Sequence, residues 1–216
     1  MKRLFTLLLI SFVASSYKMI DEKLDDFLGR DDSSVATIAN NQIWYTSTDG
    51  EIVEPRSEWY NNYADAHTTF GVNIVSNTYV DGKGVIEFDG NVTTIGDSAF
   101  YNCSSLTSVT IPDSVTTIGE WAFRSCTSLT SVTIGDSVTT IGRSAFISCS
   151  SLTSVYCKAT TPPALEGTSV FNSNGCGRKI YVPMESVEAY KSTQGWSVYA
   201  SDIVGYNFSF GICLVC

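Results

Sequence analysis

Few side chains in this sequence are spaced for catalysis or for binding a metal ion. His67 is the single histidine, and no serine near it has the Gly-x-Ser-x-Gly setting of a hydrolase nucleophile. Cys213 and Cys216 have the Cys-x-x-Cys spacing of zinc and redox sites, but they lack a second pair and a nearby histidine. We therefore predict no catalytic residue, no bound metal ion and no cofactor.

The carboxylates are arranged as a surface rather than as an acid pair. Asp97 and Glu120 lie 23 residues apart, and Arg143 takes the same position a further 23 residues on. A glycosidase needs two carboxyl groups that converge on one cleft. A position that accepts either sign of charge indicates a solvated face instead.

The spacing of 23 residues governs a long stretch of the chain. The pattern Val-Thr-Thr-Ile-Gly, followed by Ala-Phe, Cys and Leu-Thr-Ser-Val, begins at Val92, Val115 and Val138. Repeats of this length with Leu-x-x-Val-x-Ile inside them are typical of leucine-rich repeats, in which each coil stacks on the next. The sequence predicts a leucine-rich repeat solenoid over residues 85–183, mostly β structure with short helical turns. We also predict a positive φ at Gly119, which ends a short extended run.

Eight positions of each unit are apolar and are expected to point inward. In the second unit they are Val115, Ile118, Ala122, Phe123, Cys126, Leu129, Val132 and Ile134. Burial of a large apolar side chain yields about 1.5–3 kcal/mol, whereas ordering a residue costs about 1.5 kcal/mol. One coil therefore cannot fold alone, and the stack needs caps at both ends.

Both caps can be predicted. Residues 43–53 hold an Asp-Gly turn signal between two extended runs, which predicts a β-hairpin within an N-terminal β cap over residues 43–84. Residues 86–88 are in phase with residues 109–111, so a first strand is expected to precede the first full unit. Residues 184–204 predict a helical C-terminal cap, with a helix over 185–191 and with Trp196 and Tyr199 covering the last coil. Residues 205–216 form a tail of unassigned role.

The cysteines inside the repeats are predicted to be buried free thiols. Cys103, Cys126 and Cys149 occupy the same position of successive units, and Cys157 replaces an inward isoleucine. The rung spacing of a stacked sheet is only marginally compatible with disulfide geometry.

Composition and the N-terminus bear on location. The chain has 13 Lys and Arg against 22 Asp and Glu, a net charge of −9, and no basic stripe, which argues against a nucleic-acid partner. Lys2 and Arg3, an apolar run over residues 4–13 and small residues to Ser16 predict a signal peptide over residues 1–16, too short to be a transmembrane segment. Residues 17–42 are read as a short helix and linker. We expect a secreted or cell-surface protein; translation from Met19 would instead give a cytoplasmic one.

With these residues identified, the sequence resembles the BspA-type leucine-rich repeat family. Its units read Ile-Gly-x-x-Ala-Phe, then Cys, Leu-x-x-Val-x-Ile-Pro and Val-x-x-Ile-Gly, and the resemblance covers residues 85–183. The ending over residues 181–196 resembles the closing segment of such proteins in gut bacteria. Members are mostly exported or cell-surface molecules thought to act in adhesion. The resemblance implies a non-catalytic adhesion or protein-binding module whose partner is a host or matrix protein or a glycan.

Candidate binding residues lie between the inward positions or break the repeat. The residues between inward positions are strand residues in two columns, Ser108, Ser131 and Ser154 in one and Thr110, Thr133 and Tyr156 in the other. The residues that break the repeat are Tyr156, Tyr101, Trp121 and Arg124. Aromatic and Arg side chains are enriched at protein interfaces. The plain alternative is that Ser and Thr are simply solvated strand residues.

Other functions stay open at this point. A structural repeat module within a larger surface assembly would have the same fold, and threonine columns also occur on ice-binding surfaces. Tyr156 interrupts the column here, which argues against ice binding, and the missing motifs argue against an enzyme.

Overall fold

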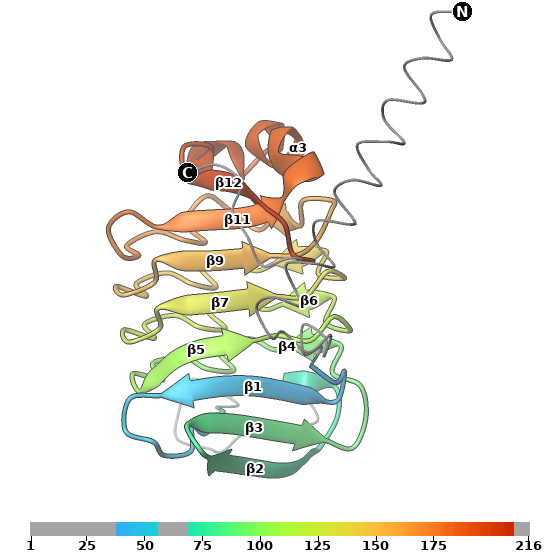
Figure 1. Ribbon diagram of the computed structural model, residues 1–216, viewed down its shortest axis with the longest axis vertical. Helices are drawn as coiled ribbons and strands as arrows, with labels where there is room; N and C mark the ends of the chain where they lie inside the picture. Colours follow the sequence, from blue (N-terminus) through green and yellow to red (C-terminus); the bar gives the residue numbers. More distant parts are fainter. Residues whose placement is uncertain (1–37, 56–68, 210–216) are drawn as a thin grey trace, which may run out of the picture. The chain divides into compact units, whose positions relative to one another are not determined.

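A computed structural model describes residues 38–55 and 69–209 of the chain. The described residues belong to one compact unit of the chain, Ile38–Cys216. The predicted signal peptide, His67, Cys213 and Cys216 lie outside the described residues. Within those residues the strands form an eight-stranded sheet and a four-stranded sheet (Figure 1).

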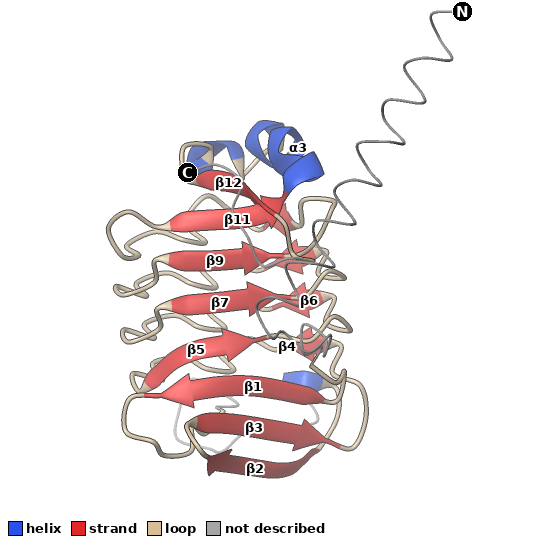
Figure 2. Cartoon of the chain, viewed as in Figure 1, coloured by secondary structure: helices blue, strands red, loops and turns tan. Residues whose placement is uncertain are grey.

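The long sheet has the strand order β12-β11-β9-β7-β5-β1-β3-β2, and the short sheet has the order β10-β8-β6-β4. The strands of the long sheet are β1 (Gln42–Ser47), β2 (Ile74–Val80), β3 (Lys83–Phe88), β5 (Leu106–Thr110), β7 (Ser131–Ile134), β9 (Ser154–Cys157), β11 (Lys179–Pro183) and β12 (Ile203–Tyr206). Those of the short sheet are β4 (Thr94–Ile95), β6 (Thr117–Ile118), β8 (Thr140–Ile141) and β10 (Ala164–Leu165). Near the C-terminal end are the 3₁₀ helices η1 (Met184–Ser186) and η2 (Ser197–Tyr199) and the α-helix α3 (Val187–Ser192) (Figure 2).

Residues 23 positions apart lie side by side in both sheets. In the long sheet β5, β7 and β9 are parallel, and Val132 pairs with Val109 on one side and Val155 on the other. In the short sheet Ile118 pairs with Ile95 and Ile141 in the same way. The strands therefore form the rungs of a stack, as Figure 1 shows.

The segment between the two sheets is also hydrogen-bonded from coil to coil. The amide of Phe123 donates to the carbonyl of Ala145 at 2.8 Å, and the amide of Ser125 donates to the carbonyl of Ile147 at 3.0 Å. Residues 120–125 form turns rather than the predicted helical turn, since Trp121 and Ser125 have φ of 57° and 61°. These left-handed residues interrupt a helix and leave the peptide groups to bond along the stack.

The predicted positive φ at Gly119 is wrong, because glycine is needed there for a different reason. Positive φ falls two residues later, at Trp121, and not at Gly119. A Cβ on Gly119 would lie 2.6 Å from the backbone nitrogen of Asp97, and one on Gly142 would lie 2.5 Å from that of Glu120. Successive coils touch backbone to backbone at this point, so a side chain has no room.

A column of aromatic rings runs through the core. Phe100, Phe123 and Phe146 are fully buried, with successive ring centroids 5.0 Å apart and ring planes within 5° of parallel. Phe171 continues the column at 5.4 Å. All eight inward positions predicted for the second unit are fully buried. The repeat thus builds one continuous core.

The predicted hairpin over residues 43–53 is wrong. Its first run is β1, but β1 pairs antiparallel with β3 and β5, so both of its edges are occupied. Residues 51–55 form no strand and are tied to β1 by a side chain, because the amide of Val53 donates to the Tyr45 hydroxyl at 3.2 Å. The hairpin of this end joins β2 to β3 through a different Asp-Gly pair, Asp81 and Gly82, which have φ of 50° and 80°.

The first strand predicted from its phase forms before the first full unit, although it is not paired with the next strand of the repeat. Residues 86–88 lie in β3, which runs in the same direction as β5 and is separated from it by β1. Residues 86–88 keep the 23-residue phase of the repeat along the chain. In the sheet, however, the neighbour of β5 on this side is β1, which precedes the repeats in the sequence.

The C-terminal end continues the long sheet and then covers the core. β11 is parallel to β9 with Ile180 beside Val155, and β12 adds one more parallel strand that includes the first two residues of the predicted tail. The predicted helix begins as η1 and ends at Ser192. Trp196 is fully buried, and its Nε1 donates to the carbonyl of Pro163 at 2.6 Å.

Replacement of one ring of the aromatic column should destabilise the whole repeat stack. Phe123→Ala removes a ring that contacts rings on both sides, and we expect it to lower the free energy of unfolding by about 3–5 kcal/mol. Urea denaturation of the variant measures the loss. Thr130→Ala, at an exposed position of the same unit, is the control and should change stability by less than about 1 kcal/mol. Equal stability of the two variants would contradict a shared core.

Candidate binding surfaces

The outer positions of β5, β7 and β9 form two rows across the long sheet. Six predicted binding residues lie there, in a serine row of Ser108, Ser131 and Ser154 and a threonine row of Thr110, Thr133 and Tyr156. All six are half-buried. The structure therefore brings these residues together on one face, with small hydroxyl side chains at five of the six positions.

Most of these hydroxyl groups have no partner within residues 38–55 and 69–209. In that part of the chain no hydrogen bond is made by the side chains of Ser131, Ser154, Thr110 or Thr133. Ser108 differs, because its hydroxyl lies 2.6 Å from the Thr46 hydroxyl of β1. The hydroxyl groups of the rows are thus available to water or to a ligand.

Sequence reasoning missed an aromatic side chain at the β1 end of the threonine row. Trp44 of β1 pairs with Thr110 and is half-buried. Its Nε1 donates to the Gln42 side chain at 2.9 Å, and the Lys83 ammonium lies 3.2 Å from the centroid of its ring. No repeat signal marks this residue, since β1 enters the sheet from outside the repeats.

A second group of aromatic side chains stands at the β11 end of the same row. The rings of Tyr156 and Tyr181 are stacked, with centroids 4.7 Å apart and planes 14° from parallel. Tyr206 packs edge-on against both at 5.2 and 5.5 Å, and Phe208 packs against Tyr206 at 4.9 Å. Only Tyr156 was predicted. Tyr181 lies 25 residues after Tyr156, the same shift of two that separates Phe171 from the repeat, so the sequence held a signal for it.

The other three predicted residues meet on a different part of the coil. The Arg124 guanidinium lies 5.4 Å from the ring centroid of Trp121 and 5.8 Å from that of Tyr101. These three half-buried residues, here called the turn cluster, come from the turns between the two sheets. In the sequence each of the three was singled out because it departs from the repeat. In the structure they lie together as one group.

Trp121 occupies a backbone position that serine holds elsewhere. Ser98 and Ser144 have φ of 57° and 55°, and Trp121 has 57°. A positive φ is uncommon for a residue as bulky as tryptophan. The amide of Trp121 donates to the carbonyl of Arg143 at 3.1 Å, so the coil-to-coil bonding continues through this residue. The tryptophan thus changes the side chain at this position but leaves the backbone conformation of the coil the same as in its neighbours.

A shallow hollow lies beside Tyr206 at the C-terminal end. It has a volume of about 400 Å³ and is lined by residues that include Asp136, Lys158 and Glu185. The Lys158 ammonium is 2.7 Å from both carboxylate oxygens of Asp113, two coils away. This ion pair crosses two coils, and it satisfies the lysine within the protein.

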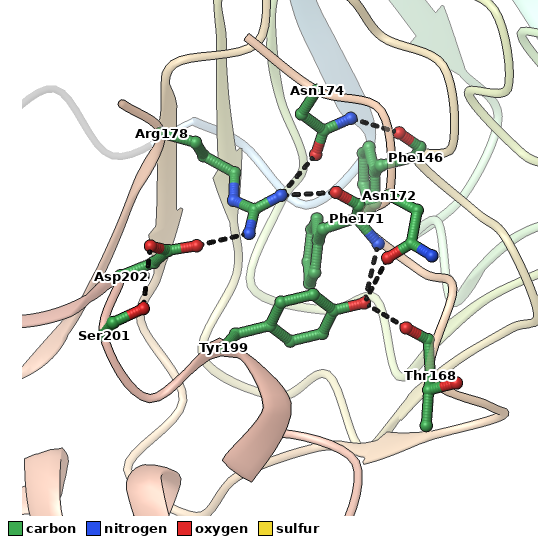
Figure 3. Close-up of polar contacts among 9 residues, drawn as sticks. All are labelled: Phe146, Thr168, Phe171, Asn172, Asn174, Arg178, Tyr199, Ser201 and Asp202. Carbon is green, nitrogen blue, oxygen red and sulfur yellow. Dashed lines mark hydrogen bonds and ion pairs between the residues drawn. The ribbon is translucent and has the colours of Figure 1, made fainter. Parts of the chain in front are cut away.

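A polar network at the C-terminal end serves the fold. Arg178 donates to the carbonyl of Phe171 and pairs with the Asp202 carboxylate at 2.5 Å, and Asn174 donates to the carbonyl of Phe146 at 2.7 Å (Figure 3). The Tyr199 hydroxyl donates to the carbonyl of Thr168 at 2.6 Å. These side chains bond the open carbonyl groups of the last turns, so the network closes the core rather than facing a ligand.

Asp97, Glu120 and Arg143 lie along the stack and not around a cleft. The Asp97 carboxylate accepts a hydrogen bond from the amide of Glu120 at 2.7 Å, and Glu120 lies 4.0 Å from Arg143. Among the described residues no cluster of three or more His, Cys, Asp or Glu side chains is arranged to hold a metal ion.

The cysteines of the repeats are buried and free. The thiol of Cys126 donates to the carbonyl of Phe100 at 3.0 Å, and that of Cys149 donates to the carbonyl of Phe123 at 3.0 Å. Cys157 lies 3.2 Å from the Tyr190 hydroxyl, which donates to the carbonyl of Ala159. Burial raises the pKa of the Cys157 thiol from its ordinary 9.0 to about 11 and also raises the pKa of Tyr190. These thiols pack the core.

Comparison with known families agrees with this geometry. The family described as "BspA type Leucine rich repeat region (6 copies)" matches residues 82–189. The chain belongs to this family, and its fold is a leucine-rich repeat fold with mostly parallel strands and few helices.

Solved structures of leucine-rich repeat proteins are similar to the chain at low identity. A T. pallidum protein is 22% identical over 55% of this chain and 64% of its own, with a TM-score of 0.37. A Bacteroides capillosus protein is 24% identical over 68% of this chain and 96% of its own, with a TM-score of 0.37. A Bacteroides ovatus protein is 21% identical over 74% of this chain and 40% of its own, with a TM-score of 0.36. The chain thus spans less than two thirds of the T. pallidum protein. No curated protein matches the chain.

Within residues 38–55 and 69–209 there is no helix with the length and apolar character required to span a membrane.

The buried thiol of Cys157 should make stability depend on pH in the alkaline range. Its pKa is raised to about 11 in the folded protein, so the unfolded chain loses the proton first as pH rises above 9. The free energy of unfolding should then fall between pH 9 and 11, with a contribution from this thiol approaching 1.4 kcal/mol per pH unit. Urea denaturation across this range should show a shallower fall for Cys157→Val. Cys176→Ser, at an exposed cysteine, is the control. An unchanged slope in Cys157→Val would contradict the assigned shift.

Proposed function

We propose that this protein is a non-catalytic binding module, a capped leucine-rich repeat solenoid that is secreted or displayed at the cell surface. Its partner is a host or matrix protein or a glycan. The basic and apolar N-terminal sequence supports export, and family membership supports a repeat protein without catalysis.

The turn cluster is the observation that carries this proposal. Serine is the repeat residue at the position of Trp121, as Ser98 and Ser144 show, and Trp121 is not among the buried residues of the core. Instead it gathers with Arg124 and Tyr101 in a half-buried group. Trp, Tyr and Arg are the side chains that dominate binding energy at protein interfaces. A departure from the repeat that produces such a group favours recognition over packing.

The ion pairs support a binding role over a catalytic one. Asp113 is bonded to Lys158, and Asp202 to Arg178. A general acid or base must be able to exchange a proton with a substrate. The carboxylates of Asp113 and Asp202 are each paired with a cation, and these ion pairs stabilise the coils.

A structural role within a larger surface assembly is the second candidate. The observation in its favour is β2, which is the outer strand of the long sheet and carries no charged residue. Val75 and Val80 are 64% and 63% exposed there. An uncharged edge strand can pair with a strand of another chain, although the β-bulge at Val75 weakens this edge.

Trp121→Ser tests the proposal with little risk to the fold, because serine is the residue of the two neighbouring units. We expect stability within about 1 kcal/mol of the parent and a loss of about 2 kcal/mol in binding, roughly thirtyfold in Kd. A panel of extracellular matrix proteins and a glycan array, followed by titration of the hits, measures the effect.

Tyr156→Thr is the matched variant on the sheet face, since Thr110 and Thr133 hold that position elsewhere. Binding lost in neither variant would refute both surfaces. Protease treatment of intact cells tests export, and protection of all the protein inside the cell would contradict a surface role.

A further inference from the structure

We infer that the outer face of the long sheet, between Trp44 and Tyr156, binds a neutral extended carbohydrate chain that runs across the strands. This inference rests on the proposed binding function and names a ligand class and a site for it. It differs from the turn cluster in both location and chemistry.

The strand registers set the two ends of the site. Trp44 pairs with Thr110, Thr110 with Thr133, and Thr133 with Tyr156. Neighbouring strands lie about 4.8 Å apart, so the two aromatic side chains stand about 14 Å apart with only threonines between them. The result is a trough across β5 and β7, with an aromatic wall at each end.

Contacts within the protein hold both walls in place. Tyr181 stacks on Tyr156 from the β11 side, and Thr133 is the register partner of Tyr156 on the β7 side. Lys83 reaches Trp44 from β3, on the side away from β5, and Gln42 accepts its indole N–H. Side chains fixed in this way lose little conformational freedom when a ligand packs against them.

The floor of the trough carries hydroxyl groups and no charge. The outward positions of β5 and β7 hold Ser and Thr only, and the hydroxyl groups of Thr110, Ser131 and Thr133 have no partner within the described ranges. A hydroxyl donates one hydrogen bond and accepts others, so it suits the hydroxyl groups of a sugar. A phosphate or a sulfated chain would need cations, which the floor lacks.

The repetition of the floor points to a ligand that also repeats. Each step from one strand to the next presents the same pair of hydroxyl groups about 4.8 Å further on, a distance comparable to one sugar residue of an extended chain. Two successive sugar residues would meet equivalent contacts on β5 and β7. The end residues would pack their C–H faces against Trp44 and Tyr156, as apolar ligand surfaces pack on aromatic rings.

Titration of the full protein with neutral linear oligosaccharides tests the inference. Cello-, xylo- and manno-oligosaccharides from disaccharide to hexasaccharide serve as probes, with oligogalacturonate as an acidic comparison. We expect at least one neutral series to bind, with an affinity that rises with length to the tetrasaccharide and then levels off. Tyr156→Thr should weaken that binding at least tenfold, and Cys176→Ser, at an exposed cysteine outside the trough, should leave it unchanged.

Trp44→Thr should weaken binding by a similar factor. Since that variant can also disturb β1, amide chemical shifts of Thr133 and Ser131 on titration of the parent protein give an independent reading and should move. Three results would each overturn the inference. They are neutral chains that bind equally well to Tyr156→Thr, a preference for the acidic chain, and amide chemical shifts of Ser131 and Thr133 that do not change on titration. A matrix protein bound through Trp121 with no carbohydrate bound would overturn it and leave the proposed function intact, whereas the absence of any ligand would count against both.

Discussion

The stacking of equivalent residues 23 positions apart is the constraint on which the rest of this structure depends. It acts three times in each coil, through a long strand, a short strand and the hydrogen-bonded turn that joins them. A single coil buries too little apolar surface to offset the cost of ordering its residues. Each coil is therefore stable only because its neighbours present the same groups at the same height.

This constraint explains which positions can vary. Gly119 and Gly142 cannot accept a side chain because the coils touch at their backbones, and Phe123 must match the rings on either side of it. Other positions accept a larger side chain without altering the coil, since Trp121 stands where two units have serine and Tyr156 stands where two units have threonine. Residues that depart from the repeat on the outside are thus the informative ones for function, whereas departures on the inside mark the ends of the stack.

The repeats could be predicted from the sequence because the same pattern occurs three times. All eight positions of the second unit that the pattern predicts to be buried are buried in the structure. The N-terminal end could not be predicted. β1 is inserted between β3 and β5 by contacts far apart in the chain, and the Asp-Gly signal at Asp49 was as strong as that at Asp81, which forms the hairpin. The candidate sites divide in the same way. Tyr181 could have been predicted from the sequence, because it lies 25 residues after Tyr156, with the same shift of two as Phe171. Trp44 could not, because it lies beside the threonine row only through the pairing of β1 with β5.

Amide hydrogen exchange in a Leu129→Ala variant tests the interdependence of the coils most directly. Leu129 is fully buried in the middle unit, while the amides of Phe100 and Phe146 donate to the coils that follow them. If the coils support one another, protection of both amides should fall together, by the same opening free energy as the unit that carries the substitution. Unchanged protection at Phe100 and Phe146, with loss confined to the middle unit, would show that the coils are stable independently and would contradict the account.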